Sequence, residues 1–285
     1  MRRKVKSQAD VDRYIKQGLG QGEREEYQPW LRVQDVPSRG RSCKVHGFVV
    51  SRNYQLLSDL EYAYWLQLDF SETVLDILEQ FPLLPVSALQ AIASSRGVEY
   101  PAYVGTKVPV PYVMTTDFVI TVLASDGSKK TVARTVKYLD ELIDEKTGLR
   151  TAQKLEIEEE YWTAQGVSWN VVTEKNMPVV VTRNLDWLRK DSPFQNKLES
   201  DEAVCVFIQE LKRAQFFGWT LRRTLEHVST RMRERYEICA YMYRFVVWNK
   251  LIRIDLMKPI TLNGPFPEFE ILDNSLTDTF IAEVV

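Results

Sequence analysis

The segment TTDFVITVLASDGSKKTVARTVKY, residues 115–138, decides the fold prediction. Two runs rich in β-branched residues flank Asp126-Gly127, a dipeptide typical of tight hairpin turns. We therefore predict strands at about 113–123 and 130–138. Asp117 is the unusual residue, because aspartate is a poor strand former and apolar residues follow it. It is either half of a cross-strand ion pair or part of a functional site.

The predicted register depends on the centre of the hairpin loop. A loop centred on Gly127 places Asp117 opposite Lys137, with Thr135 one diagonal step away on the same face. An ion pair there contributes about 0.2–1 kcal/mol. A carboxylate beside an ammonium group is also what metal-dependent phosphodiester cleavage requires. The hairpin by itself leaves both interpretations open.

A second carboxylate lies at the start of a predicted helix over 58–70. Ser58 and Glu61 have the Ser-x-x-Glu spacing of a capping box, which is the simpler interpretation. Glu61 could also turn towards the sheet and share a metal ion with Asp117. Spacing alone does not choose between the two.

The residues around this core predict an α/β sandwich. We expect a helix at 8–18 that starts at Ser7 and Asp10 and ends at the glycines of GLGQG, with irregular chain up to residue 50. GLGQG follows a helix, so a connector is a simpler interpretation than a phosphate loop. Further predicted elements are a strand at 74–81, a helix at 86–96, a helix at 151–165 capped by Thr151, a strand at 167–173 and a helix at 179–190.

The pattern changes after Asp191-Ser192-Pro193, which we interpret as a linker. Helices are predicted at 200–215, 220–231 and 233–248, followed by strands at 250–256 and 269–272. Three helices and a hairpin are the order of a winged helix, a module that docks DNA or protein. We therefore predict two domains, 1–190 and 191–285.

Composition excludes several functional classes. The chain has 285 residues, 45% hydrophobic and 27% charged, with no apolar run near the roughly 18 residues that span a bilayer. Its basic N-terminus lacks the apolar stretch of a secretory signal. Three separated cysteines fit a reducing cytoplasm, and two histidines argue against a zinc site or a His-based triad.

Charge is unevenly distributed, although the net charge is only −2. Residues 1–60 carry twelve Lys/Arg against seven Asp/Glu, and residues 220–255 carry eight against four. Residues 268–285 carry five acids and no Lys or Arg. The basic regions fit local phosphate contact or ordinary solvated surface equally well. The DNA-contact candidates are Arg2, Arg3, Lys4, Arg39, Arg41, Arg222, Arg223 and Arg231.

Several long segments resemble the TnsA family of bacterial transposition proteins. They are QGLGQGEREEYQPWLRVQDVPSRGRS (17–42), LLSDLEYAYWLQLDFSETVLDILEQFPLLP (56–85), MTTDF (114–118), VKY (136–138) and KLEIEEEYWTAQGVSW (154–169). The resemblance implies a restriction-endonuclease-like, PD-(D/E)XK-type N-terminal domain and a winged-helix C-terminal domain. It also implies Mg²⁺-dependent DNA cleavage at transposon ends, on the strand that the partner transposase leaves uncut.

The same resemblance assigns site residues. The acidic helix residue falls on Glu61, the strand aspartate on Asp117 and the lysine on Lys137. The residue two before the lysine is usually an amide or an acid, but here it is Thr135, a weaker neutral ligand. We therefore expect Glu61, Asp117, Thr135 and the Val136 carbonyl to hold Mg²⁺, with Mn²⁺ able to substitute.

The implied partners are transposon-end DNA, a DDE-type transposase and an AAA+ regulator ATPase, in the bacterial cytoplasm and with no membrane. Thr135 favours one alternative, a catalytically weakened nuclease-fold adaptor that bridges transposase and regulator. Two others are an autonomous nuclease and a structural domain in which Asp117 and Lys137 only stabilise the hairpin.

Overall fold

The computed structural model describes residues 4–36, 41–190 and 201–272. These residues form two compact units that divide between Met177 and Pro178. Each unit is described separately below.

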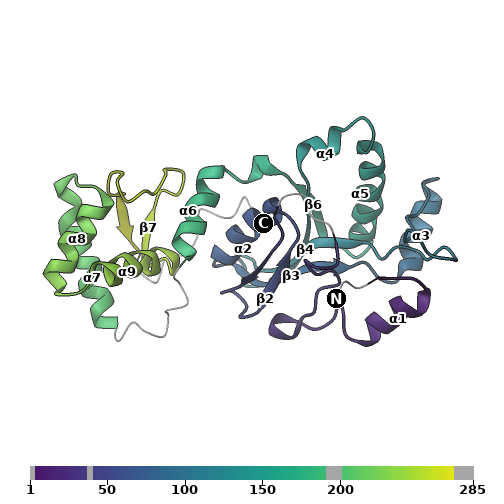
Figure 1. Ribbon diagram of the computed structural model, residues 1–285, viewed down its shortest axis with the longest axis horizontal. Helices are drawn as coiled ribbons and strands as arrows, with labels where there is room; N and C mark the ends of the chain where they lie inside the picture. Colours follow the sequence, from purple (N-terminus) through teal and green to yellow (C-terminus); the bar gives the residue numbers. More distant parts are fainter. Residues whose placement is uncertain (1–3, 37–40, 191–200, 273–285) are drawn as a thin grey trace. The chain divides into compact units, whose positions relative to one another are not determined.

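The first unit is built on a mixed four-stranded sheet (Figure 1). Its strand order is β3-β4-β5-β6, with β3, β4 and β5 antiparallel and β6 parallel to β5. The strands of this unit are β1 (Cys43–His46), β2 (Asn53–Leu56), β3 (Val74–Pro82), β4 (Thr115–Leu123), β5 (Lys129–Val136) and β6 (Ser168–Val172). Its helices are α1 (Gln8–Lys16), α2 (Asp59–Phe70), α3 (Val86–Ser95), α4 (Leu139–Ile143) and α5 (Gly148–Thr163).

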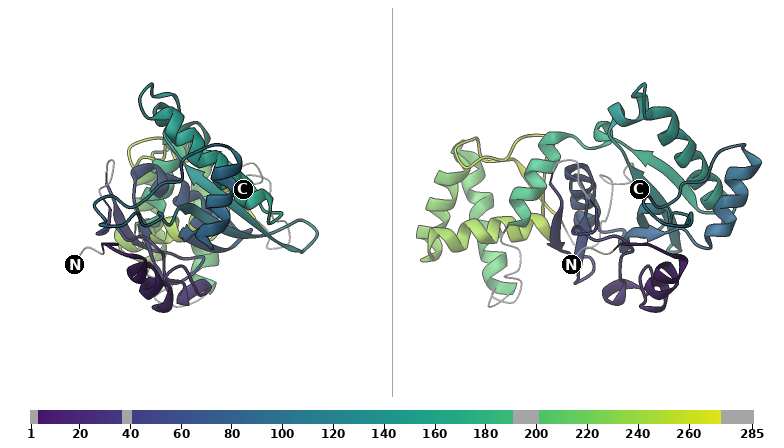
Figure 2. Two further views of the ribbon diagram at one scale, coloured as in Figure 1. Left: turned by 90° about the vertical axis from the view of Figure 1, so that its right-hand side faces the viewer. Right: turned by 45° about the vertical axis from the view of Figure 1, so that its right-hand side comes forward.

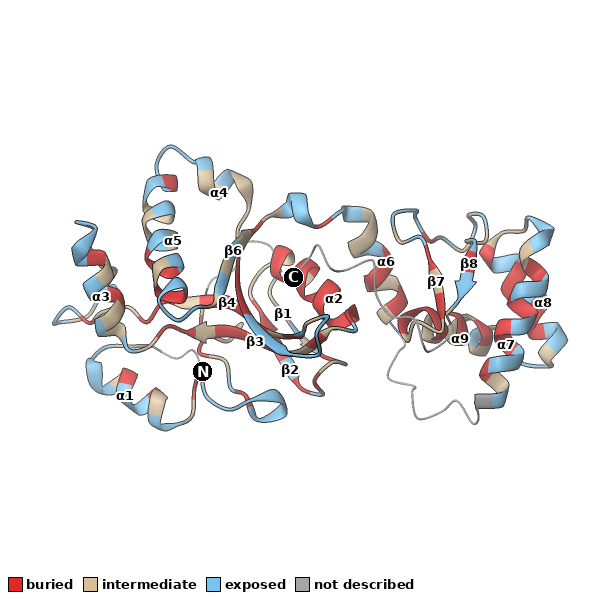
Figure 3. Cartoon of the chain, turned by 180° about the vertical axis from the view of Figure 1, so that it is seen from behind, coloured by how far each residue is buried: buried red, intermediate tan, exposed pale blue. Residues whose placement is uncertain are grey.

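Helices cover both faces of the sheet. α2 packs on one face, where the Tyr64 ring meets Phe118 edge-on, and α2 is buried along most of its length (Figure 3). α3 and α5 cover the other face, where Ile157 joins Val119 and Ala133 in one core cluster. Phe118 and Val119 are adjacent in β4 and therefore point to opposite faces. The predicted α/β architecture is thus confirmed for this unit.

The β4–β5 hairpin forms as predicted, but its register differs by two residues. Val119 lies opposite Ala133, so the loop is centred on Asp126 and Asp117 faces the position of Thr135. Ala124 and Ser128 close the loop, and Gly127 has φ +78°. Glycine adopts that left-handed conformation without strain, as a three-residue hairpin loop requires at its last position. A register shift of two residues does not by itself exchange the two faces of a strand.

Two other local predictions need correction. Residues up to 50 are not all irregular, because β1 pairs with β2 in a short hairpin beside α2, in dark blue in Figure 2. α5 begins at Gly148 with Thr147 at its N-cap, so Thr151 is not the cap. The first difference arises because β1 and β2 are short and have a weak signal in sequence, and the second because sequence places helix boundaries imprecisely.

The GLGQG segment is a packed turn against β3. A Cβ atom at Gly20 would lie 2.1 Å from Pro82 Cγ, so no other residue fits there without movement. Leu19 is buried, and the Gly20 amide donates to the Gln28 carbonyl. The glycines therefore allow close packing of this turn on the sheet.

A buried ion pair ties β3 to the segment before β2. Arg52 donates from Nη1 to Glu79 Oε1 at 3.0 Å and from Nη2 to Glu79 Oε2 at 2.5 Å. Glu79 is 0% exposed, although strand carboxylates are mostly exposed. Arg52 also stacks on Tyr54, and Tyr27 donates to the Glu79 carbonyl. Tyr27 and Trp30 are both buried packing residues.

The second unit holds α6 (Val179–Arg189), α7 (Asp201–Ala214), α8 (Leu221–Met232), α9 (Tyr236–Trp248) and the antiparallel pair β7 (Ile252–Ile254) and β8 (Phe269–Ile271). The predicted order of three helices followed by two strands is therefore present. α6 also packs here, upstream of the predicted boundary at residue 190, because the buried Asn184 side chain donates to the Leu256 and Lys258 carbonyls. Within the described residues, no helix combines the length and hydropathy needed to cross a membrane.

Candidate active site

Glu61 lies in the first turn of α2 and is 6% exposed. The Ser58 hydroxyl accepts from the Glu61 amide at 3.1 Å and donates to Glu61 Oε1 at 3.1 Å. The Leu57 amide donates to Oε2 at 2.9 Å. The Ser58 N-cap predicted from Ser-x-x-Glu is therefore present, but Glu61 accepts from the Leu57 amide instead of the cap amide. These bonds hold the carboxylate at the sheet rather than in solvent.

Asp117 is the centre of the hairpin side of the site. Its Oδ2 accepts from the Val136 amide at 2.7 Å and from Lys137 Nζ at 3.2 Å. Lys137 Nζ also donates to the Val136 carbonyl at 2.9 Å. The predicted Asp117–Lys137 pair therefore forms, at the end of the two strands and with Asp117 8% exposed.

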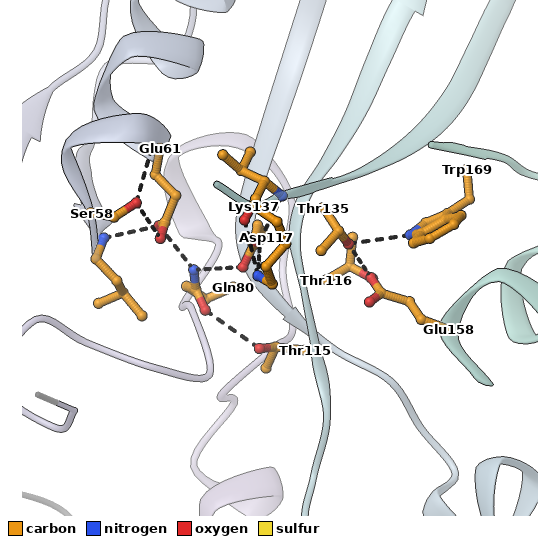
Figure 4. Close-up of polar contacts among 12 residues, drawn as sticks. Ser58, Glu61, Gln80, Thr115, Thr116, Asp117, Thr135, Lys137, Glu158 and Trp169 are labelled. Atoms are coloured by element: carbon orange, nitrogen blue, oxygen red, sulfur yellow. Dashed lines mark hydrogen bonds and ion pairs between the residues drawn. The ribbon is translucent and has the colours of Figure 1, made fainter. Parts of the chain in front are cut away.

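Gln80 of β3 connects the two carboxylates (Figure 4). Its Nε2 donates to Glu61 Oε2 at 3.1 Å and lies 3.5 Å from Asp117 Oδ1. Its Oε1 accepts from the Thr115 hydroxyl at 3.4 Å. Glu61 and Asp117, which lie on different elements, are thus brought to one amide group.

The strands lose their regular alternation at this point. Leu78 and Phe81 are three residues apart, yet both pack against the core cluster under α5. Strict alternation would place them on opposite faces. Gln80 between them has φ +51°, a left-handed conformation that is unusual for any residue but glycine. This irregularity lies beside Asp117 and breaks the alternation on which the sequence prediction depended.

Thr135 belongs to a neighbouring cluster centred on Glu158 of α5. The Thr135 hydroxyl donates to Glu158 Oε1 and accepts from Trp169 Nε1 at 3.2 Å. Thr116 donates to the same Glu158 oxygen at 2.6 Å. Figure 4 shows these contacts directed away from Glu61. The Thr135 side chain is thus engaged by Glu158 and Trp169, whereas the Val136 backbone lies beside Asp117.

Burial and charge shift the acidities of these groups. Burial, reinforced by the Asp117 charge, raises the pKa of Glu61 to about 8. Burial raises the pKa of Glu158 to about 7. Burial opposes the charge of Lys137, but Asp117, Glu158 and Glu61 outweigh it and raise the pKa of Lys137. A site with more carboxylates than cations therefore favours binding of positive charge.

The raised pKa of Glu61 predicts how metal-free stability depends on pH. The folded protein binds the Glu61 proton more tightly than the unfolded chain does, and this binding stabilises the fold. The stabilisation is complete below the unfolded pKa of about 4.3 and is lost as pH rises to the folded value of about 8. In EDTA, Glu61→Gln should gain stability relative to wild type between these values, by at most about 1.4 kcal/mol per pH unit. Urea unfolding at pH 5 to 8 measures this difference.

Glu156→Gln is the control for that measurement, since Glu156 is an exposed glutamate of α5. Its stability should follow wild type across the pH range. Parallel curves for Glu61→Gln and wild type would contradict the raised Glu61 pKa.

The donor set fits a hard divalent cation. Glu61 and Asp117 supply carboxylate oxygens, and the Val136 carbonyl beside them supplies a neutral oxygen, which are the ligand types that Mg²⁺ prefers. Among the described residues, no group of three or more His, Cys, Asp or Glu side chains is arranged to hold a metal ion. Neutral oxygens would therefore have to complete the coordination.

The predicted DNA-contact residues are dispersed. Lys4, Arg41, Arg222, Arg223 and Arg231 are exposed, whereas Arg2, Arg3 and Arg39 lie outside the described residues. Arg41 pairs with Asp59 at 3.2 Å, and Arg231 pairs with Glu210 at 3.4 Å. Arg223 lies over the Trp219 ring, and Arg222 donates to Asn263. Their role in DNA contact stays a prediction.

Sequence reasoning missed two residues of this region, Gln80 and Glu158. The sequence does not identify Gln80 as a site residue, because a glutamine in a mostly apolar strand is ordinarily predicted to be a surface residue. Glu158 lies in the acidic run Glu158–Glu160, where charge alone suggests a solvated helix face. Its position directly after Ile157 and three residues before Tyr161, both core residues, is the signal that could have found it.

Comparison with known proteins agrees with this picture. The family model "TnsA-like endonuclease N terminal" matches residues 71–174, which include Gln80, Asp117, Lys137 and Glu158. The chain is 42% identical over 182 residues to "Transposon Tn7 transposition protein TnsA" of Escherichia coli. That alignment covers 64% of this chain and 63% of the relative, less than two thirds of its length. The chain is therefore similar to TnsA proteins over these residues.

Proposed function

We propose that this chain is a metal-dependent DNA endonuclease that acts within a transposase assembly. The observation that supports it best is the convergence of Glu61, Asp117 and Lys137, from a helix and two neighbouring strands, around one set of contacts. The name of the Escherichia coli relative and the description of the family model point to the same activity and process. We infer a restriction-endonuclease-like fold for the first unit and a winged helix for the second.

The proposed chemistry is hydrolysis of one phosphodiester bond at each transposon end. A bound Mg²⁺, or Mn²⁺ in its place, would polarise the phosphate and lower the pKa of a bound water. Glu61, Asp117 and the Val136 carbonyl would hold the cation. Lys137, kept positive by the surrounding carboxylates, would orient the water or offset the charge that develops on the phosphate. Water is the nucleophile, so no covalent intermediate forms.

Glu158 and Thr135 act in this proposal as a support behind the site. Glu158 accepts hydrogen bonds from Thr116 in β4 and Thr135 in β5. It therefore holds together the two strands that carry Asp117 and Val136. Its charge also raises the pKa of Lys137. Thr135 would then serve through position, and not as a ligand as the sequence suggested.

The proposed setting is the bacterial cytoplasm, with a DDE-type transposase and an AAA+ regulator as partners. The chain would cut the strand that the transposase leaves uncut. The test is strand-resolved cleavage of transposon-end DNA by the reconstituted complex with Mg²⁺, Mn²⁺ or EDTA. Wild type should cut its strand only with metal, and Asp117→Ala should not cut it while the transposase's own cut persists. Equal cleavage by both proteins would overturn the nuclease assignment.

One observation favours a second candidate, an adaptor of nuclease fold with little activity. The Thr135 hydroxyl is occupied by Glu158 and Trp169, so the site has fewer side-chain ligands than the family pattern implies. An adaptor would support assembly of the complex when Asp117 is replaced, with no metal-dependent cut to lose. The same cleavage assay therefore separates the two candidates. Cutting by the isolated chain would instead indicate an autonomous nuclease.

A further inference from the structure

Gln80 is the feature that the proposed mechanism leaves unexplained. It is 1% exposed, and its backbone has φ +51° near the end of β3, an edge strand of the four-stranded sheet. A left-handed conformation costs a non-glycine residue about 1–2 kcal/mol, so the surrounding structure must hold it there. The Trp30 amide donates to the Gln80 carbonyl at 3.2 Å, and the neighbouring Glu79 is fixed by Arg52.

The strained backbone delivers the side chain between two carboxylates. Nε2 is 3.1 Å from Glu61 Oε2 and 3.5 Å from Asp117 Oδ1. An NH₂ group has two hydrogens, so it can serve one oxygen from each carboxylate. Two acids this close repel each other when ionised, and a shared donor reduces that cost without carrying charge. The amide group thus lies where a bridging cation would be most strongly attracted.

The same amide also carries an oxygen, which is a ligand type suited to Mg²⁺. Within the described part of the chain, Oε1 accepts only from the Thr115 hydroxyl, at 3.4 Å, which is a long contact. The hydroxyl of Thr135, by contrast, is engaged by Glu158 and Trp169. Gln80 is therefore a better placed neutral side-chain ligand than Thr135.

We propose that Gln80 has two roles at this site: its NH₂ group holds Glu61 and Asp117 together without metal, and its amide oxygen becomes a ligand when a divalent cation binds. This inference rests on the proposed function. The resemblance implies an amide or acid ligand two residues before the lysine, where this chain has Thr135. In this proposal Gln80 of β3 supplies that amide ligand instead. Gln80 is then a specificity-determining residue for the cation as well as a positioning residue for the two acids.

The test is Mn²⁺ binding by the full-length chain, measured by calorimetry and by the electron paramagnetic resonance signal of free Mn²⁺. Gln80→Met removes both donor and ligand and should weaken Mn²⁺ binding by about tenfold or more. Gln80→Glu keeps an oxygen ligand and should bind Mn²⁺ as tightly as wild type or more tightly. In EDTA, both variants should melt at lower temperature than wild type, because neither ionised Glu nor Met donates to the two acids.

Gln67→Met is the matched control. Gln67 is a buried glutamine of α2 whose Nε2 has no hydrogen-bond partner among the residues that the structure describes, so its replacement should leave Mn²⁺ affinity unchanged. A purely structural role for Gln80 would weaken Mn²⁺ binding equally in Gln80→Met and Gln80→Glu, and that result overturns the proposal. Wild-type affinity in Gln80→Met also overturns it. If Gln80→Met does not fold, Gln80→Glu decides alone, since weaker binding than wild type contradicts a ligand role.

The proposed function and this inference fail in distinguishable ways. If wild type binds Mn²⁺ no better than Asp117→Ala, the metal site itself is rejected, and with it the inference. If wild type binds Mn²⁺ through Asp117 but is insensitive to Gln80, only the inference is rejected.

Discussion

Replacing Glu79 with glutamine should lower the free energy of unfolding by about 3–5 kcal/mol, the cost of leaving a buried charge without its partner. Arg52 is 7% exposed and Glu79 is 0% exposed, so water cannot replace the lost carboxylate. Burial opposes the charge of Arg52, but its bonds to Glu79 hold the Arg52 pKa above its ordinary value. Arg52 would therefore stay charged in the variant, beside neutral groups such as the glutamine side-chain oxygen, the Ile77 carbonyl and two tyrosine rings, with no carboxylate bonded to its guanidinium group.

Urea unfolding of the full-length chain, fitted with separate transitions for the two units, measures this effect. Arg96→Met is the control, because Arg96 pairs with Glu156 and Glu160 at the surface and should cost only about 0–1 kcal/mol. The double variant Arg52→Met/Glu79→Gln should lose less than the sum of its single variants, since it contains no unpaired charge. Additive losses would show that the pair is not coupled.

This ion pair also illustrates where sequence reasoning fails. Glu79 lies between Leu78 and Phe81 in an otherwise mostly apolar strand. A carboxylate in such a pattern is normally predicted to face solvent. Its partner Arg52 is 27 residues away and belongs to a segment with no strong secondary-structure signal. Pairing between distant buried charges leaves no periodic trace, so only the folded structure reveals it.

Periodic features were predicted well, by contrast. The β4–β5 hairpin follows from its β-branched runs and from Asp126-Gly127, and α2 follows from its apolar stripe. The register error of two residues was harmless, because the side-chain period of a strand is two. Asp117 and Lys137 meet even though the predicted loop centre was wrong by one residue, but Thr135, which was predicted on the same face, contacts Glu158 instead.

The remainder of the site depends on a local break in that periodicity. The left-handed backbone at Gln80 changes which side chains of β3 and β4 share a face. At a position without glycine, the residue type does not predict a left-handed backbone conformation. Glu61 could be placed from its capping pattern, but its contact with Asp117 through Gln80 could not, since it depends on three elements at once.

Lys137→Met should reduce metal-dependent cleavage by the reconstituted complex by about 10²–10⁴-fold, if the proposed function holds. Lys137 Nζ lies 3.2 Å from Asp117 Oδ2, and the surrounding carboxylates raise its pKa, so it is charged at neutral pH. The proposed role of this charge is to stabilise the transition state, and methionine retains the length of the side chain without the charge. Strand-resolved cleavage under single-turnover conditions measures the loss.

Metal binding should separate this role from that of the carboxylates. Removing a positive charge beside Asp117 favours a cation there, so Lys137→Met should bind Mn²⁺ as tightly as wild type or more tightly, whereas Asp117→Ala should lose binding. Lys130→Met is the matched control, because Lys130 is an exposed lysine of β5, the strand that Lys137 directly follows, and should change neither quantity. If Lys137→Met lost Mn²⁺ binding together with cleavage, Lys137 would be holding Asp117 in place, and the charge on the reacting phosphate would need another partner.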